Sequence, residues 1–300
     1  MYVGRFAPSP TGPLHFGSLV AAVASYADAR AAHGQWLLRI EDVDTTRCSR
    51  AAETEILRQL ASYGFVADGA VIRQSVRGEI YAAAIAQLAG AGHLFACACS
   101  RKVLEAAPRN ADGETIYPGS CRDSGVVADA HSVRVRVVDD GHSRVAFTDR
   151  ACAVITQNVA AEVGDFVLRR ADHCYAYQLA VVVDDASQGV TDVVRGEDLL
   201  MNTPRQIYLQ RLLGVATPTY LHVPLVRNAE GEKLSKQTLA GAIKVDAAVE
   251  TLRAAWRFLK QDELGCVRSV EAFWKVASAA WNPQLLQRRT PPLQERLGRD

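Results

Sequence analysis

The sequence lacks the features of several protein classes. No apolar run approaches the length that a bilayer-spanning helix needs, and no basic region followed by a hydrophobic stretch opens the chain. We therefore expect a cytoplasmic protein without a membrane partner. An excess of basic charge is also missing, because 34 Lys and Arg residues face 33 Asp and Glu residues. A nucleic-acid partner must accordingly be bound by a local patch rather than by the whole surface.

Cysteine and lysine are both scarce. Seven cysteines in 300 residues do not suggest a disulfide scaffold. Only six lysines occur, and two of them, Lys233 and Lys236, lie three residues apart. Hydrophobic residues make up 49% of the chain and charged residues 22%, which is ordinary globular composition and excludes a disordered or fibrous protein. The length predicts one large domain with an insertion, or two domains.

The first 40 residues have the pattern of a β-α-β unit. A short strand at residues 2–7 runs into a loop rich in proline and glycine, and an Ala-rich helix then extends from Gly17 to near Gly34, with Ser18 as the expected N-cap. Residues 36–40 form a second apolar strand. This order at this spacing predicts an α/β protein with a parallel sheet.

The later pattern alternates between parallel strands and an insertion of different character. Helices are predicted at about 50–63 and around 80–88. Residues 132–137 alternate strictly, which predicts a half-buried antiparallel strand inside an insertion at 97–174. Parallel-type strands are expected at 178–183, 192–195 and 220–225, with a helix beginning at Thr203-Pro204 and helical structure from about 246.

Two short motifs could bind phosphate. His15-Phe16-Gly17-Ser18 lies where a loop enters a helix, and the N–H groups of a helix N-terminus attract anions. Lys233 and Lys236, with a serine between them, could clamp a polyphosphate. Alone, each motif also fits an ordinary helix start or a solvated loop. Together they fall at the first strand–helix crossing and after the last sheet strand, as a switch-point site requires.

These segments resemble class I aminoacyl-tRNA synthetases. Residues 5–18, RFAPSPTGPLHFGS, look like the glutamyl version of the "HIGH" signature, and residues 233–237, KLSKQ, resemble "KMSKS" with Leu for Met and Gln for the final Ser. Residues 38–47, LRIEDVDTTR, and 194–199, VRGEDL, fit the same family. The resemblance covers residues 3 to about 240. It implies a Rossmann-type catalytic domain that makes an aminoacyl-adenylate from ATP, expected with Mg²⁺, and releases pyrophosphate.

The resemblance also implies roles for individual residues. His15 and Lys236 would bind phosphate with help from Lys233, and these three are the expected catalytic residues. The implied ATP-binding set is His15, Gly17, Ser18 and Lys236. The implied glutamate-binding set is Arg5, Phe6, Ala7, Pro8, Ser9, Glu41, Tyr177 and Arg195.

A glutamate pocket has its own chemical requirements, and the chain meets them. Arg5 and Arg195 can each bind a carboxylate bidentately, and Glu41 is the natural counter-ion for the ammonium. Tyr177, expected at the head of the strand at 178–183, could hydrogen-bond a carboxylate, and nearby Tyr175 is the weaker candidate. The acidic residues Asp42, Asp44, Asp184 and Asp185 are expected to be loop caps or structural partners rather than ligands.

A cysteine cluster predicts a structural zinc site in the insertion. Cys97, Cys99 and Cys121 supply three thiolates, which suit Zn²⁺. Tyr117 is the fourth position that the glutamyl-Q family pattern uses, although a phenol is an unusual zinc ligand. His93, His131 and water are the alternatives, and three unlinked cysteines would need no metal.

The expected domain division follows from the same resemblance. Residues 1–96 and 175–245 would form the catalytic domain, 97–174 a zinc-bearing insertion and 246–300 a short helical segment without an anticodon-binding domain. Only about 60 residues follow KLSKQ. This architecture is similar to the glutamyl-Q tRNA(Asp) synthetase family, which activates glutamate without tRNA and attaches it to queuosine in the anticodon loop of tRNA(Asp).

We therefore predict an enzyme that takes L-glutamate, ATP and queuosine-containing tRNA(Asp), and we expect a monomer. The alternatives are a compact synthetase that charges the 3′ end of tRNA(Glu) or tRNA(Gln), and a noncatalytic tRNA-binding paralogue. Candidate tRNA contacts are arginines of the insertion and the tail: Arg101, Arg109, Arg122, Arg134, Arg136, Arg288, Arg289 and Arg296.

Overall fold

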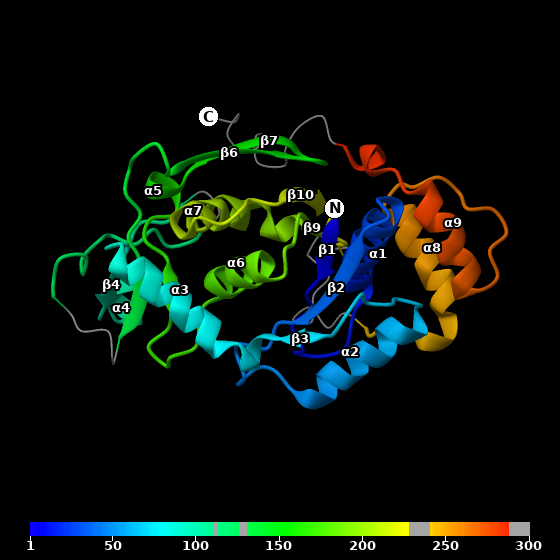
Figure 1. The fold of residues 1–300 in the computed structure, drawn as a ribbon, viewed down its shortest axis with the longest axis horizontal. Coiled ribbons are helices and arrows are strands. Elements are labelled where there is room, and N and C mark those ends of the chain that lie inside the picture. Colours follow the sequence, from blue (N-terminus) through cyan, green and yellow to red (C-terminus); the bar gives the residue numbers. More distant parts are fainter. Residues whose placement is uncertain (111–112, 126–130, 228–240, 288–300) are drawn as a thin grey trace.

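A seven-stranded sheet with strand order β3-β2-β1-β9-β10-β6-β7 organises the protein (Figure 1). The computed structural model describes residues 1–110, 113–125, 131–227 and 241–287. Neighbouring strands of this sheet are parallel except for the antiparallel pair β6–β7. The strands are β1 Val3–Phe6, β2 Gln35–Ile40, β3 Ile72–Arg73, β6 Arg144–Asp149, β7 Ala153–Asn158, β9 Asp192–Gly196 and β10 Thr219–Val223. The predicted parallel α/β sheet is confirmed.

Helices cover both faces of the sheet. They are α1 Phe16–Ala31, α2 Arg50–Ser62, α3 Gly78–Gly90, α6 Tyr177–Ser187, α7 Thr203–Leu213, α8 Ala248–Phe258 and α9 Val270–Ala280, with the short α4 Arg101–Glu105 and α5 Val159–Glu162. α8 and α9 pack on α1 (Figure 1). None of the helices in the described part of the chain is long and apolar enough to cross a bilayer.

Two apolar cores lie on opposite faces of the sheet, because successive strand residues point to opposite sides. In β9, Val193 belongs to the core with α3, α6 and α7, and Val194 belongs to the core with α1, α8 and α9. On β10, Tyr220 belongs to the core with α3, α6 and α7, and Leu221 belongs to the core with α1, α8 and α9. The sheet is therefore buried on both sides, which explains why its strands are nearly continuous apolar runs in the sequence.

One predicted strand is wrong. The segment expected to form a strand at 178–183 belongs to helix α6, so Tyr177 is the first residue of a helix and not the head of a strand. Four consecutive apolar residues of this helix, Leu179 to Val182, are all buried. A helix buried on most sides shows no 3.6-residue period, and its β-branched valines favour a strand in a prediction from pattern alone.

The segment between residues 97 and 174 contributes to two sheets. A smaller antiparallel sheet has the order β4-β5-β8, with β4 at Leu94–Cys97, β5 at Ser132–Val135 and β8 at Val167–Arg169. The predicted antiparallel strand in this region is confirmed by β5. Strand β6, in contrast, pairs in parallel with β10 of the main sheet. The domain boundaries given above stay a prediction.

Candidate active site

A cavity of about 590 Å³ opens where β1 and β9 end, beside the start of α1. β1 and β9 are neighbours in the sheet, but the chain continues from them in opposite directions, to β2 and to β10. Such a switch point is where open α/β sheets bind ligands. The cavity is lined by Arg5, Phe6, Ala7, Pro8, Ser9, His15, Gly17, Ser18, Glu41, Tyr177 and Arg195. The structure thus brings together these eleven predicted ligand residues, while their binding of glutamate and ATP stays a prediction.

The remaining predicted residues have different locations. Lys233 and Lys236 lie outside the described residues. Tyr175, the weaker candidate, is not among the cavity-lining residues, and its ring packs on Tyr81 with the ring centroids 5.2 Å apart.

His15 caps helix α1 with its side chain. Its Nδ1 accepts a hydrogen bond from the backbone N–H of Ser18 at 3.3 Å. The neutral imidazole therefore carries its proton on Nε2, from which it can donate to an anion. The expectation that Ser18 is the N-cap is wrong, because the helix begins earlier, at Phe16. The positive end of the α1 dipole lies at the cavity and favours negative charge there.

A buried chain of ion pairs connects Arg5 to Glu41. The Asp185 carboxylate of α6 accepts from Arg5 Nε at 3.1 Å and from Arg39 Nη1 at 2.8 Å. Arg39 in turn donates from Nη2 to Glu41 at 3.3 Å. Since Asp185 occupies Nε of Arg5, the two Nη groups of Arg5 are the ones that can face a ligand. Asp185 is therefore a structural partner, as expected.

In this network of ion pairs, the pKa values of Asp185 and Glu41 shift in opposite directions. Burial tends to raise the pKa of Asp185, but the adjacent Arg5 and Arg39 outweigh burial and hold its pKa below the usual value. Burial also raises the pKa of Glu41, and there Arg39 and Arg5 only partly offset it. A cation beside Glu41 would stabilise its charged form, which suits a site for an ammonium group.

Arg195 is fixed by contacts from several elements. Its Nε donates to His222 Nε2 at 3.0 Å, and its Nη2 donates to the Thr203 hydroxyl at 2.8 Å. Nη1 donates to the Tyr177 hydroxyl at 3.4 Å. The Arg195 side chain is thus held in one orientation at the cavity, where Nη1 keeps a second proton and Tyr177 keeps its own hydroxyl proton for a ligand.

The sequence matches a known catalytic domain over most of its length. The family model for the class I tRNA synthetase catalytic domain of the glutamate and glutamine type matches residues 2–255. A protein of Thiobacillus denitrificans named glutamyl-Q tRNA(Asp) synthetase is 58% identical over 255 residues, which are 84% of this chain and 83% of that protein. The chain belongs to the class I tRNA synthetases of the glutamate and glutamine type. It is a ligase of the aminoacyl-tRNA synthetase type.

Further comparisons agree with this assignment. A second protein named glutamyl-Q tRNA(Asp) synthetase, from Verminephrobacter eiseniae, is 53% identical over 291 residues, which are 95% of this chain and 98% of that protein. A solved glutamate-tRNA synthetase of Elizabethkingia anophelis superposes with a TM-score of 0.75 at 22% identity. The match covers 97% of this chain and 67% of that protein, and it shows that the two share a fold.

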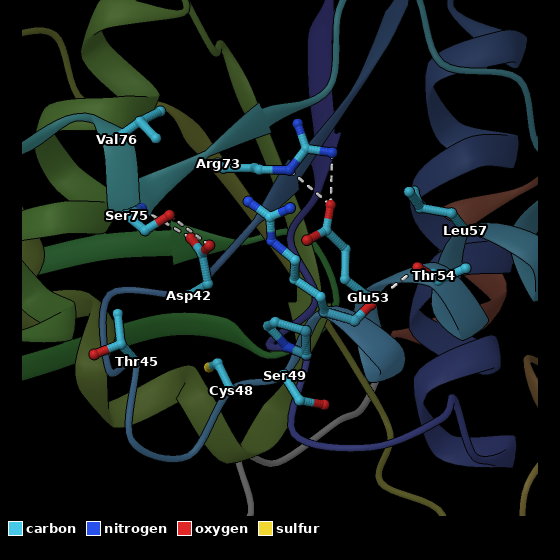
Figure 2. A pocket seen from close by; sticks show the side chains of 12 residues that line it. Asp42, Thr45, Cys48, Ser49, Glu53, Thr54, Leu57, Arg73, Ser75 and Val76 are labelled. Carbon is cyan, nitrogen blue, oxygen red and sulfur yellow. Dashed lines mark hydrogen bonds and ion pairs between the residues drawn. The ribbon is translucent and has the colours of Figure 1, made fainter.

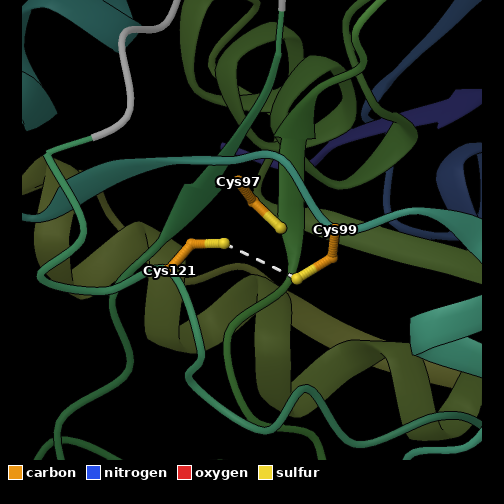
Figure 3. Close-up of side chains that lie close together, drawn as sticks. All are labelled: Cys97, Cys99 and Cys121. Atoms are coloured by element: carbon orange, nitrogen blue, oxygen red, sulfur yellow. Dashed lines mark hydrogen bonds between the residues drawn. The ribbon is translucent and has the colours of Figure 1, made fainter.

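The cysteine cluster forms a possible metal site in this family member. The three thiols of Cys97, Cys99 and Cys121 are turned toward one another (Figure 3), and their sulfur atoms all lie within 4.8 Å. The Tyr117 hydroxyl oxygen is 3.3 Å from Cys97 Sγ and 3.6 Å from Cys99 Sγ. Ligands of a tetrahedral zinc ion lie roughly 3.5–3.8 Å apart. Three separations within the group, Cys97 Sγ and Cys99 Sγ to the Tyr117 hydroxyl and Cys99 Sγ to Cys121 Sγ at 3.5 Å, are close to this range, so the cluster could hold a metal ion.

The protonation chemistry of the cluster is consistent with a metal-binding group. Burial tends to raise the pKa of Cys97, but its hydrogen bond with Tyr117, the backbone of Cys99 and the nearby Arg134 lower it to about 7. Burial raises the pKa of Tyr117, so a bound cation would have to stabilise its phenolate. Neither His93 nor His131 belongs to the side chains gathered there in the described part of the chain.

The predicted tRNA-binding arginines of the insertion mostly contact the protein itself. Arg122 forms an ion pair with Asp165 at 2.6 Å. The guanidinium of Arg134 lies 4.1 Å from the centroid of the Tyr117 ring, and Arg136 donates to the carbonyl of Arg122 at 2.6 Å. The three tail arginines lie outside the described residues, and so does the side chain of Arg101. Arg122, Arg134 and Arg136 thus support the insertion.

A second cavity, of about 530 Å³, lies between the start of α2 and β3 (Figure 2). Its two carboxylates are already paired: Asp42 accepts from the backbone and hydroxyl of Ser75, and Glu53 accepts from Arg73 at 2.7 Å. None of the residues predicted to bind glutamate or ATP lines this cavity. Its polar groups stabilise the junction of β2, α2 and β3.

The sequence-based prediction gave no role to Arg39 or His222. Both are fully buried on the α6 and α7 side of the sheet, behind the cavity. The available signal was a titratable residue within an otherwise apolar strand, because such a residue needs a buried partner. The identity of that partner could not be predicted from the sequence pattern.

Proposed function

We propose that this protein activates L-glutamate with ATP to glutamyl-adenylate, without needing tRNA, and transfers the glutamyl group to queuosine in the anticodon loop of tRNA(Asp). The observation that supports this most directly is a cavity that combines two buried guanidinium groups, the Glu41 carboxylate, whose side chain is 10% exposed, and a helix N-terminus. Glutamate carries two carboxylates and one ammonium, and ATP carries the phosphates. The names of the relatives supply the proposed acceptor.

In this proposal each charged group of glutamate binds a cavity residue of opposite or complementary character. Glu41 binds the ammonium, and the Nη groups of Arg5 bind one carboxylate. The second carboxylate takes one hydrogen bond from Arg195 Nη1 and one from the Tyr177 hydroxyl, because the other N–H groups of Arg195 are directed to protein acceptors. The carboxylate is thus bound by one hydrogen bond from each of two residues, in place of the bidentate contact that was expected from Arg195 alone.

The chemical step needs positioning more than it needs a protein nucleophile. The substrate carboxylate attacks the α-phosphorus of ATP, and pyrophosphate leaves. His15 and the N-terminus of α1 would stabilise the charge that develops on the phosphates, with Lys233 and Lys236 in support. Mg²⁺ would neutralise further phosphate charge when bound with ATP.

We further propose that Cys97, Cys99, Cys121 and Tyr117 hold a structural zinc ion. The zinc ion would cross-link β4 to the loop that carries Tyr117 and Cys121. Because ATP and tRNA are the proposed substrates, we place the protein in the cytoplasm, and we retain the prediction of a monomer.

The deciding experiment loads labelled glutamate onto tRNA. We expect acceptance by tRNA(Asp) that carries queuosine, no acceptance by the same tRNA without queuosine, and glutamate-dependent ATP–pyrophosphate exchange in the absence of any tRNA. Loading of tRNA(Glu) at its 3′ end would instead identify a compact glutamyl-tRNA synthetase. A protein that exchanges no pyrophosphate and only binds tRNA would be the noncatalytic paralogue.

A further inference from the structure

His222 of β10 lies buried between a carboxylate and a guanidinium. Its Nδ1 is 2.6 Å from Asp149 Oδ2, and its Nε2 is 3.0 Å from Nε of Arg195. The three side chains come from β6, β10 and β9, which are adjacent strands of the main sheet. His222 and Arg195 are direct partners in the β9–β10 register.

The hydrogen-bond roles in this trio are fixed by chemistry. Arginine has only donors, so Nε2 of His222 must accept with its lone pair. The imidazole proton then sits on Nδ1 and donates to Asp149. Asp149 is itself held by the backbone N–H groups of Ala151 and Cys152 at 2.9 and 3.0 Å. A single neutral tautomer of His222 therefore satisfies both neighbours.

Resting on the proposed function, we propose that His222 and Asp149 are positioning residues for glutamate. Asp149 fixes the His222 tautomer, and the neutral imidazole holds the Arg195 guanidinium edge-on so that Nη1 points to the substrate carboxylate beside Tyr177. Protonation of His222 would replace the acceptor with a donor and place a second positive charge against Arg195. Glutamate affinity should therefore fall as His222 becomes protonated.

The groups that face His222 determine the pH at which it becomes protonated. Burial lowers the pKa of His222 below its usual 6.5 and Arg195 lowers it further, while Asp149 and Asp198 act in the opposite direction. The Thr203 hydroxyl lies 3.3 Å from Nε2, and the Tyr220 ring stacks at 6.1 Å. The neutral form thus dominates at pH 7, and the loss of affinity is expected below pH 6.5.

The test compares two substitutions in glutamate-dependent ATP–pyrophosphate exchange. His222→Leu removes the acceptor, and we expect the KM for glutamate to rise about 10-fold or more, because a hydrogen bond to a charged group is lost. The KM for ATP should stay within about 2-fold, since Arg195 is assigned to glutamate. His222→Gln keeps an acceptor at the Nε2 position and should restore most of the affinity. His142→Gln, at an exposed loop position, is the matched control and should behave like the parent.

The pH profile separates positioning from a structural role. As the pH is lowered below 6.5, the parent should show a rise in the KM for glutamate when His222 becomes protonated. His222→Gln should lack that rise, while any pH dependence that comes from Glu41 remains. Equal KM values and parallel pH profiles in the parent, His222→Leu and His222→Gln would overturn the proposal.

A measurement on the parent protein tests the proposed tautomer directly. It does not depend on whether the variants fold or are active. In histidine-labelled parent protein, ¹⁵N NMR should show His222 with a protonated Nδ1 and an unprotonated Nε2 at pH 7. The opposite tautomer would overturn the proposal even in an active enzyme. A parent with this tautomer but without pyrophosphate exchange would refute the proposed function, and the positioning of glutamate with it.

Discussion

Substitution of Asp185 by Asn tests the buried ion-pair chain by a change of one charge at nearly constant volume. The Asp185 side chain is 9% exposed and bridges Arg5 and Arg39, whose side chains are 4% and 0% exposed. Neutralising it leaves two buried guanidinium groups with less compensating charge. Removing one partner of a buried pair typically costs about 3–5 kcal/mol.

This cost can be converted into a melting temperature. Unfolding entropy is about 2.1 cal/mol/K per residue, which for a chain of this length gives roughly 0.6 kcal/mol per degree. Asp185→Asn should therefore lower the Tm by about 5–8 °C in a calorimetric or circular-dichroism melt at pH 7.

The matched control is Glu55→Gln, which neutralises the same charge in the exposed pair with Arg58 on α2. Exposed pairs contribute little, so its Tm should stay within about 1 °C of the parent. A shift of less than about 2 °C for Asp185→Asn, or equal shifts for the two variants, would show that the buried charges do not depend on Asp185 as argued.

Three further predictions concern the site, the metal and acid stability. Arg195→Ala should abolish glutamate-dependent ATP–pyrophosphate exchange while far-UV circular dichroism stays native, with Arg58→Ala as a fully active control; undiminished exchange would remove Arg195 from the pocket. Purified protein should contain about one zinc ion per chain by metal analysis, and the Cys121→Ser variant should lose it. A parent protein that contains no zinc and whose folding does not change on addition of a chelator would refute the metal site. Because the pKa of Asp185 is lowered in the folded state, its stabilising effect is present above the unfolded value of about 3.9 and is lost as the pH falls through the folded value. The Tm difference between parent and Asp185→Asn should therefore shrink below pH 4, and a constant difference would contradict this linkage.

The sequence predicted those parts of the fold in which the local pattern and the tertiary environment agree. The β-α-β unit at the start, helix α2 and strands β9 and β10 were all predicted. The apolar spacing of α2 matches the face that it buries, and β9 and β10 are short apolar runs within a sheet that is buried on both sides. Helix α6 was missed because burial on most sides removes the period that distinguishes a helix from a strand. The motif residues around the cavity were predicted because they lie in short contiguous segments that resemble the signatures of the family.

What the sequence alone determined is the family, and it predicted which residues to look for at the site. Arg5, Glu41 and Arg195 were predicted from the motifs, and the spacing of Cys97, Cys99 and Cys121 predicted a metal site. The tertiary structure decided which atoms of these groups are available. Asp149 and His222 are 73 positions apart and are joined to Arg195 by the sheet order, so no local pattern could connect them. A buried charge needs a partner, but the partner is selected by strand order and helix packing, which are properties of the whole fold.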